Sequence, residues 1–295
     1  MPKLYWELKN KTYQHSPYVT FYVKDPKLRE INKATVRDRV LHQAVFSRLY
    51  LIFDKYFIFD SYSSRDVKGT HAAVRRFNQF AAKVGKNNTR TCYILKCDIK
   101  KFFASIDQEI LMSLIKRRVF YEDILWLLQI IIKSFKKGIP LGNVTSQIFA
   151  NIYLNELDQF LKRTLKIKYY IRYCDDFVIL SEDEKYLERL ILQISIFLQT
   201  HLKLSLHPNK ISIRKYHRGI DFLGYVNFSY HKILRVKTEK RMFQKLGVKI
   251  AELKGGKISE KSFNQTLWSY YGMLKHCDSY ELGERLVNFL WQHFY

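Results

Sequence analysis

The sequence predicts an α+β protein in which an antiparallel sheet is covered by helices on one face. Short β-branched and aromatic runs bounded by charged or turn residues predict strands, notably at 93–98, 170–180 and 220–228. Between them, apolar residues recur at helical spacing over longer segments. A hydrophobic content of 47% over 295 residues is enough for one large core or for two to three subdomains.

In the first third of the chain we expect one strand and two helices. Residues 1–34 are polar and aromatic, with a strand at 18–23 before a turn at Asp25-Pro26. A helix is expected through 37–56. A polar loop at 61–71 then leads into a helix whose apolar face comprises Ala73, Val74, Phe77, Phe80 and Ala81.

The middle of the chain is mainly helical after the 93–98 strand. Ser105–Gln108 resembles a capping box that opens a helix over 110–119, so Asp107 is interpreted as a helix-start residue. A helix at 123–133, a turn at 138–143 and a long apolar helix at 145–165 follow.

The last third begins with a hairpin around 173–176, which is followed by a helix over 182–202 and a loop feeding a strand near 211–213. A further hairpin covers 220–228, where Gly224 is interpreted as allowing a close backbone approach. From about residue 236, a subdomain joint, the chain is helical, with segments at 238–253, 258–275 and 279–293.

The charge is strongly positive and spread along the whole chain. Lys and Arg total 51 against 27 Asp and Glu, a net charge of +24, which predicts a polyanionic partner. A membrane surface also attracts such charge, but no apolar run reaches the roughly 18 residues of a spanning helix. The N-terminus lacks a signal-peptide core. We therefore expect no membrane partner and a cytoplasmic location.

The four cysteines form neither a C-x-x-C pair nor a set with paired histidines. Neither a zinc site nor a disulfide framework is indicated, which fits a reduced compartment.

Two adjacent carboxylates, Asp175 and Asp176, lie at the tip of the central hairpin. Asp is an ordinary turn residue, so the pair alone carries little information. However, a second strand ends in Asp98, and two strand-end carboxylate sites can share a pair of divalent ions. Such a pair clamps the attacking hydroxyl and the leaving pyrophosphate in nucleotidyl transfer. We expect Asp98 and Asp175 as principal Mg²⁺ ligands, with Asp176 and the Ile99 carbonyl assisting.

Three motifs resemble those of prokaryotic reverse transcriptases of the group II intron and retroelement lineage. Tyr173–Asp176 matches the family's Y-x-D-D box, Cys97–Phe103 matches its first palm motif, and Ser61–His71 is similar to its S-Y-G-F-R-P-G-R-S-x-H motif. The resemblance implies a right-hand polymerase with fingers over 1–90, a palm over 91–236 and a short helical thumb over 237–295. Residues 108–140 would be a partly helical insertion into the palm. It also implies template RNA, an RNA/DNA heteroduplex and dNTPs as partners, and two Mg²⁺ ions for which Mn²⁺ can substitute.

The same resemblance assigns roles to residues that otherwise have ordinary interpretations. Arg65 and Lys68, otherwise surface charge, would bind the incoming triphosphate. Phe103, otherwise a core ring, would exclude the sugar 2′-hydroxyl. Lys210 would join the catalytic residues by protonating the leaving pyrophosphate. Phe222, Leu223, Gly224 and Tyr225 resemble a primer grip, and in the thumb Lys275 and His276 are expected near backbone phosphate, with Trp268 and Leu274 inside.

One departure from the family pattern indicates which subgroup of these reverse transcriptases the chain resembles. Where P-Q-G is usual the chain has Pro140-Leu141-Gly142, and where S-P is usual it has Ser146-Gln147. This pairing resembles diversity-generating retroelements, whose reverse transcriptases make errors at adenines and work with a basic accessory variability protein. Leu141 would lie at the nucleotide, and Ser146 and Gln147 at template or primer. A longer N-terminal extension and the maturase and endonuclease domains are expected to be absent.

The same motifs and charge are compatible with other functions. The chain could be a retron, defence-associated or intron-derived reverse transcriptase without a mutagenic role. An RNA-directed RNA polymerase is disfavoured by the bulk of Phe103. A catalytically silent RNA-binding scaffold would use only the positive charge.

Overall fold

The computed structural model describes residues 2–24 and 27–294, so the turn expected at Asp25-Pro26 lies outside the described residues. The chain forms two compact units, each made of separate segments. The first comprises Met1–Ala73, Leu95–Ile179 and Glu184–Ile213, and the second comprises Val74–Ile94, Leu180–Asp183 and Arg214–Tyr295. The division into three contiguous parts remains a prediction.

Helices make up most of the described chain. The α-helices are α1 Pro2–Lys9, α2 Val36–Phe53, α3 Thr70–Val84, α4 Phe102–Ser105, α5 Gln108–Lys116, α6 Glu122–Lys133, α7 Val144–Gln159, α8 Glu184–Leu202, α9 Val236–Lys254, α10 Glu260–Leu274 and α11 Tyr280–Phe294. Short 3₁₀ turns occupy Asp54–Tyr56, Pro208–Lys210 and Tyr216–Arg218, and α7 runs on into a π-helical turn, Phe160–Thr164.

The strands form three sheets. They are β1 Val19–Lys24, β2 Leu28–Lys33, β3 Tyr93–Asp98, β4 Tyr170–Tyr173, β5 Asp176–Ser181, β6 Ser212–Lys215, β7 Ile220–Phe222, β8 Tyr225–Asn227 and β9 Lys232–Leu234. Their orders are β1-β2, β4-β5-β3-β6 and β7-β8-β9.

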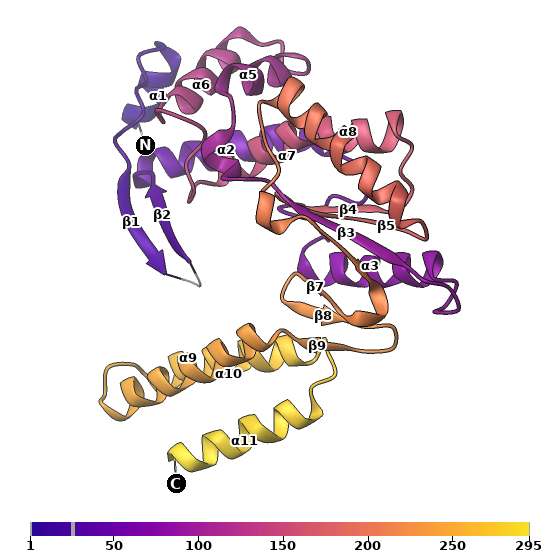
Figure 1. Cartoon of the computed structure of the whole chain (residues 1–295). Coiled ribbons are helices and arrows are strands. Elements are labelled where there is room, and N and C mark those ends of the chain that lie inside the picture. The colour runs from indigo at the N-terminus through magenta and orange to yellow at the C-terminus, as the bar shows by residue number, and fades with distance from the viewer. Residues whose placement is uncertain (1, 25–26, 295) are drawn as a thin grey trace. The chain divides into compact units, whose positions relative to one another are not determined.

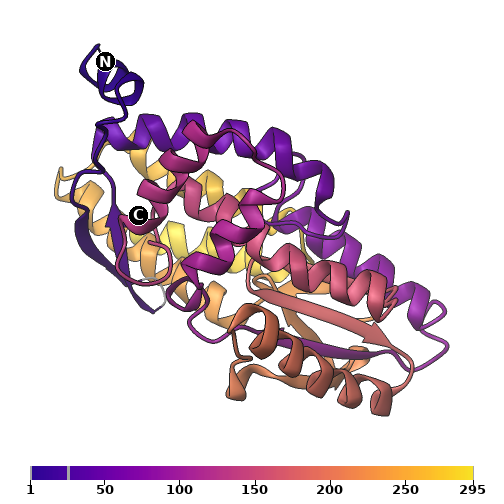
Figure 2. The same cartoon turned by 90° about the horizontal axis from the view of Figure 1, so that it is seen from above.

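An antiparallel ribbon, β1–β2, opens the first unit after α1. Val19 pairs with Lys33 and Phe21 with Ile31, and every residue of β1 is exposed. In Figures 1 and 2 this indigo ribbon lies at the outer edge of the unit. The sequence predicted β1 to within a residue. It missed α1 and β2, because their many polar residues obscure the helical period in α1 and the two-residue alternation in β2.

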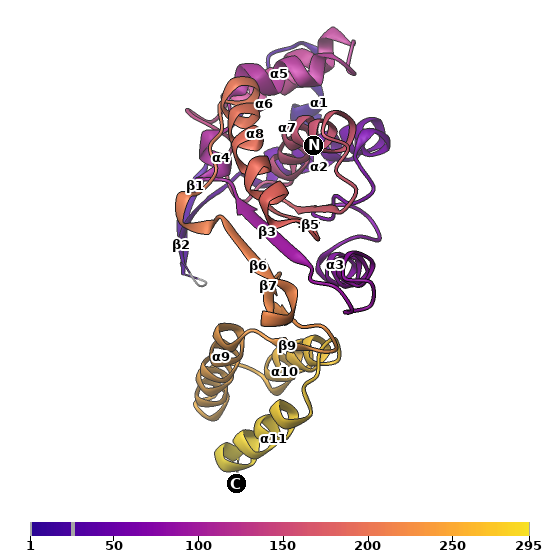
Figure 3. The same ribbon diagram turned by 45° about the vertical axis from the view of Figure 1, so that its right-hand side comes forward.

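The central strands of the four-stranded sheet are largely apolar because they are β-branched and aromatic runs. In the antiparallel pair β4–β5, Tyr170 opposes Ile179 and Tyr173 opposes Asp176. Residues Phe177, Val178 and Ile179 are completely buried. The helices α2, α5, α6, α7 and α8 gather on one side of these strands, as expected for this fold class (Figures 1 and 3).

The second unit combines α3, a small sheet and the three C-terminal helices. In β7–β8, Ile220 pairs with Asn227, and the buried ring of Phe222 lies 5.1 Å from that of Phe77 on α3. The helices α9 and α10 pack side by side in Figure 1. All three helices lie within a few residues of the predicted segments, because their apolar residues follow the helical period clearly.

Three local expectations are corrected. Asp107 does start α5 as expected, because it is the N-cap and its carboxylate accepts from the amides of Glu109 and Ile110. The capping box at Ser105–Gln108 does not form, however, since the Ser105 hydroxyl donates to the Lys100 carbonyl. A Cβ at Gly224 would meet nothing within 4 Å. Glycine therefore suits this position because of its positive φ of +92°, and not because another backbone approaches closely. Trp268 is 68% exposed, not inside, whereas Leu274 is buried as expected.

Among the described residues no helix is both long and apolar enough to span a bilayer. All four cysteines are free thiols.

Candidate active site

Asp98 is the last residue of β3, and the strand end that carries it is tied to neighbours on both sides. The His207 amide donates to the Asp98 carbonyl at 2.8 Å, and the Lys100 amide donates to Ser205 at 2.9 Å. On the other side the Ile99 amide donates to the Asp175 carbonyl at 3.3 Å. These backbone bonds hold the end of β3 directly beside the carboxylate-bearing turn.

That turn is a tight two-residue connection between β4 and β5. Tyr173 pairs with Asp176 across it, and Cys174 adopts the left-handed region with φ of +55°. A non-glycine residue there needs support. The guanidinium of Arg172 provides it by donating to the Cys174 carbonyl at 3.1 Å.

Arg172 is itself held by a buried network that the sequence did not reveal. Its guanidinium donates twice to Asp158 of α7, at 2.8 and 2.6 Å, and both side chains are fully buried. Nη1 also donates to Asn151 and Nη2 to the Ser61 hydroxyl. An ion pair enclosed this completely positions the turn because neither partner can move without leaving an unpaired charge.

Two lysines neutralise the carboxylates in part. Lys210 Nζ lies 2.5 Å from Asp98 Oδ2, and Lys96 Nζ lies 3.5 Å from Asp176 Oδ2. The role of Lys96 was missed, although its position two residues before Asp98 puts both side chains on one face of β3. Lys210 follows His207, which caps the short Pro208–Lys210 turn.

The remaining electrostatics favour an added cation. Burial raises the pKa of Asp176 to about 6, and neighbouring Asp98 and Asp175 add to the shift while Lys96 opposes it. Burial first, and then Asp98, also raise the pKa of Asp175. Asp176 Oδ1 is buried and has no hydrogen-bond partner. A carboxylate oxygen without a donor is costly unless a cation completes its surroundings.

These hard oxygen donors would suit a divalent cation, which would also balance their negative charge. Within the described part of the chain, no three His, Cys, Asp or Glu side chains are gathered closely enough to hold one metal ion. Asp98, Asp175 and Asp176 nevertheless offer hard oxygens on adjoining strand ends, one of them unpartnered. These are the residues that would hold the ions.

Phe103 is half-buried at the start of α4 and has its backbone clamped. Its carbonyl accepts from the Ile139 amide at 2.9 Å, and its ring lies edge-on to Phe102 at 5.3 Å. A Cβ at Gly138 would lie 2.2 Å from the Phe103 carbonyl oxygen, so only glycine permits this contact. The ring of Phe103 is therefore partly exposed on a backbone whose position is fixed.

Leu141 belongs to a turn that is anchored to β2. Its carbonyl accepts from the Asn32 amide at 2.8 Å, while the Asn143 carboxamide donates to Asn32 and accepts from the Ala34 amide. The side chain of Leu141 stays half-exposed.

Ser146 and Gln147 lie in the first turn of α7 and differ in exposure. Ser146 is buried and its hydroxyl donates to the Pro140 carbonyl at 2.6 Å, a bond that shapes the turn. Gln147 is exposed and is the one of the two that a ligand can reach.

The side chains of Arg65 and Lys68 are bonded to different partners. The Arg65 side chain is 8% exposed and is bonded to Asp54 at 2.6 Å and to the carbonyls of Ile58 and Ser61. It holds its own loop in this structure. Lys68 is half-exposed, with Nζ 3.0 Å from the Phe59 carbonyl and 3.4 Å above the Phe59 ring.

In the second unit, the residues likened to a primer grip form the β7–β8 turn. Phe222 and Tyr225 are buried and paired, while Leu223 and Gly224 have positive φ values of 51° and 92°. Lys275 is exposed and His276 half-exposed after α10.

Comparison with known proteins agrees with this geometry. The family model for reverse transcriptase (RNA-dependent DNA polymerase) matches residues 23–227. Protein YkfC of Escherichia coli (strain K12) is 26% identical over 276 residues, covering 79% of this chain and 70% of YkfC. The group II intron-encoded protein LtrA of Lactococcus lactis subsp. cremoris is 23% identical over 304 residues, covering 76% of this chain and 49% of LtrA. The chain thus spans about half the length of LtrA.

Solved structures show the same fold. Apo telomerase from Candida tropicalis matches with a TM-score of 0.58 at 13% identity, over 94% of this chain and 61% of that chain. Telomerase from Candida tropicalis in complex with a TWJ fragment of telomeric RNA matches with a TM-score of 0.57 at 14% identity, over 98% of this chain and 60% of that chain. The fold is therefore consistent with that of a right-hand polymerase.

Since the family match covers well over half of the sequence, the chain belongs to the reverse transcriptase family, the RNA-dependent DNA polymerases.

Proposed function

We propose that this chain copies an RNA template into complementary DNA by adding deoxynucleotides to a primer 3′-hydroxyl. The observation that carries the proposal is the meeting of Asp98 with the Asp175-Asp176 turn at adjoining strand ends, where Asp176 Oδ1 lacks a partner. A pair of Mg²⁺ ions, when bound, supplies activation of the primer hydroxyl and neutralises charge on the pyrophosphate.

The chain's own residues would do the rest. Lys210, already 2.5 Å from Asp98, would turn to the leaving pyrophosphate and give it a proton. Phe103 would close the space that a 2′-hydroxyl needs. Lys68 is better placed than Arg65 to reach a triphosphate, because Arg65 is held by Asp54.

The decisive experiment is primer extension on an RNA template with dNTPs and Mg²⁺. The double variant D175N/D176N is expected to abolish extension while retaining RNA binding, since the positive surface is untouched. Extension at the wild-type rate by this variant would refute the mechanism. If the variant also loses RNA binding, its lost extension would be assigned to a folding defect and not to the chemistry.

We further propose that copying is error-prone at adenines, as in a diversity-generating retroelement with a basic accessory variability protein. The support is Leu141, an aliphatic side chain half-exposed on a turn anchored to β2, where family members carry an amide. Loss of that polar contact would weaken the check on the nascent pair. A Leu141→Gln variant should then copy adenine more accurately, and an unchanged error spectrum would count against the idea.

The likeness to the group II intron-encoded LtrA favours a second candidate, an intron-derived, retron or defence-associated enzyme without a mutagenic role. Sequencing the complementary DNA made on a known template separates the two. Errors concentrated at adenines support the first candidate, and errors spread over all four bases support the second. A repeat pair differing at adenines beside the gene would support the first independently.

A further inference from the structure

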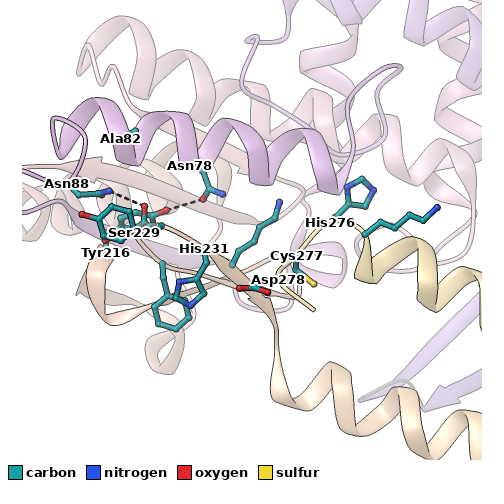
Figure 4. Close-up of a pocket in the computed structure, with 13 residues that line it drawn as sticks. Asn78, Ala82, Asn88, Tyr216, Ser229, His231, His276, Cys277 and Asp278 are labelled. Carbon is teal, nitrogen blue, oxygen red and sulfur yellow. Dashed lines mark hydrogen bonds between the residues drawn. The ribbon is translucent and has the colours of Figure 1, made fainter. Parts of the chain in front are cut away.

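The second unit contains a cavity of about 660 Å³ that shares no residue with the carboxylate site. We call it the α3 cavity. Its walls come from α3, the loop after α3, Tyr216, the β8–β9 turn and the loop between α10 and α11. Figure 4 shows Asn78 and Ala82 on α3, with His231 on the turn and His276 to Asp278 on the α10–α11 loop.

The walls are fixed by hydrogen bonds across the cavity. The Tyr216 hydroxyl donates to Asn78 Oδ1 at 3.3 Å, and Asn88 Nδ2 donates to the Ser229 carbonyl at 3.0 Å, the two dashed lines of Figure 4. The Asp278 amide donates to the Lys232 carbonyl at 2.7 Å. The α10–α11 loop is thereby tied to β9, so the cavity is preformed.

One wall presents a pair of stacked rings. Phe228 and His231 lie 4.8 Å apart at an interplanar angle of 14°, and the Phe228 amide donates to the His231 carbonyl across the turn. Phe228 packs on Gly219, where a Cβ would lie 2.5 Å from its ring. Tyr230, beside them, is 87% exposed. A supported ring pair next to an open tyrosine is the surface on which unpaired bases stack.

The same cavity is also lined by positive charge. Lys232 and Lys275 line it together with His231 and His276, and Asp278 is the sole carboxylate among the lining residues that the structure describes. Burial lowers the pKa of Lys232, Cys277 opposes the shift, and Arg75 adds to it. A partly buried ammonium group gains from a bound anion.

We propose that the α3 cavity binds an unpaired segment of RNA, with a base stacked on the Phe228–His231 rings and phosphate held by Lys232 and Lys275. The volume suits roughly one or two nucleotides, and a concave pocket of this size cannot admit a duplex. The proposal rests on the proposed function only in taking RNA as the substrate. Because its test measures binding and not synthesis, the two can fail separately.

The test uses the full chain preloaded with a saturating RNA/DNA hairpin, so that the polymerase site is filled. Binding of a fluorescent unpaired RNA octamer is then measured by anisotropy. The variant H231A/K232Q should weaken octamer binding by roughly ten-fold or more, as expected for one lost stack and one lost charge. The control Y280A/K257Q removes an exposed tyrosine and a lysine of the same unit outside the cavity, and should bind the octamer like the wild type.

A photo-crosslink on the wild type makes the test independent of any variant's folding. An octamer carrying 4-thiouridine should crosslink to the segment 228–232. Equal octamer binding by H231A/K232Q and the wild type, or crosslinks only outside the cavity, would overturn the proposal. So would equal competition by a glutamate-rich peptide, which would assign the cavity to an acidic protein.

Discussion

At the scale of single residues, the carboxylate site contains side chains that remain accessible to a substrate. Lys210 reaches Asp98 at 2.5 Å while 41% of its side chain stays exposed, so it can leave the carboxylate when a substrate arrives. Phe103 keeps part of its ring open above a clamped backbone.

The substitution K210Q is expected to lower the rate of single-nucleotide addition by roughly 100-fold, the usual contribution of a general acid. Rapid-quench kinetics would measure the rate of addition. The matched control is K203Q, because Lys203 makes a comparable 2.6 Å ion pair with Asp107 at the surface. If K210Q and K203Q slow nucleotide addition equally, the effect of Lys210 would come from its charge and not from proton donation.

The substitution F103A is expected to raise ribonucleotide use relative to deoxynucleotide use by on the order of 100-fold, because the 2′-hydroxyl gains space. The ratio of kcat/KM for the two nucleotide types gives the measurement. F103Y keeps the bulk and should keep the selectivity of the wild type. An unchanged ratio in F103A would make Phe103 an ordinary packing residue.

At the scale of elements, the turn that carries the carboxylates is held from behind by α7. Asp158 near the end of that helix and Arg172 on β4 form the ion pair whose guanidinium also fixes the Cys174 carbonyl. The interaction is fully buried, which makes the two charges mutually dependent.

The substitution D158N should destabilise the protein by about 3–5 kcal/mol, since it leaves the guanidinium buried without its counter-charge. E156Q on the same helix removes one partner of an exposed pair with Arg117 and should cost less than about 1 kcal/mol. Urea unfolding measures both. Similar midpoints for the two variants would mean that the buried pair contributes little.

The connection before α7 allows a cleaner test of close packing. Gly138 and Gly256 have nearly the same φ, +69° and +68°, but a Cβ at Gly138 would strike the backbone of Phe103 and Ala104, whereas at Gly256 it would meet nothing within 4 Å. Both alanine variants carry the strain of positive φ. G138A should lose about 1–3 kcal/mol more than G256A, and should also slow nucleotide addition. Equal stabilities would show that the loop shifts freely.

The sequence was informative where a pattern is local. The strand ends with Asp98 and Asp175, the N-cap function of Asp107 and the helices after 236 all follow from short-range periodicity and turn chemistry. It could not reveal Arg172 with Asp158, because two charges 14 residues apart meet only through the packing of β4 on α7. Trp268 was misplaced since helical spacing alone cannot tell which side of a helix faces solvent.

At the scale of the whole molecule, charge is the dominant property. With 51 basic and 27 acidic residues, the chain carries a net charge of +24, which favours any polyanion before specific contacts form.

RNA affinity should therefore depend steeply on salt. The logarithm of the binding constant is expected to fall linearly with the logarithm of KCl concentration, with a slope of about −0.7 for each phosphate contacted on a single strand, so roughly −3 or steeper overall. Anisotropy titrations between low and moderate salt would give the slope. A slope near zero would mean that the net charge plays no part in binding.

The exposed β1–β2 ribbon raises the matter of self-association. Within the described residues it pairs with no third strand, and Val19, Phe21, Tyr22 and Leu28 are exposed, so each edge could accept a strand from another copy. Lys24, Lys33 and Arg29 lie on the same two strands, so two ribbons brought edge to edge would place positive charges close together. Like charge would oppose such pairing, so basic residues of the kind proposed to attract RNA would also disfavour self-association.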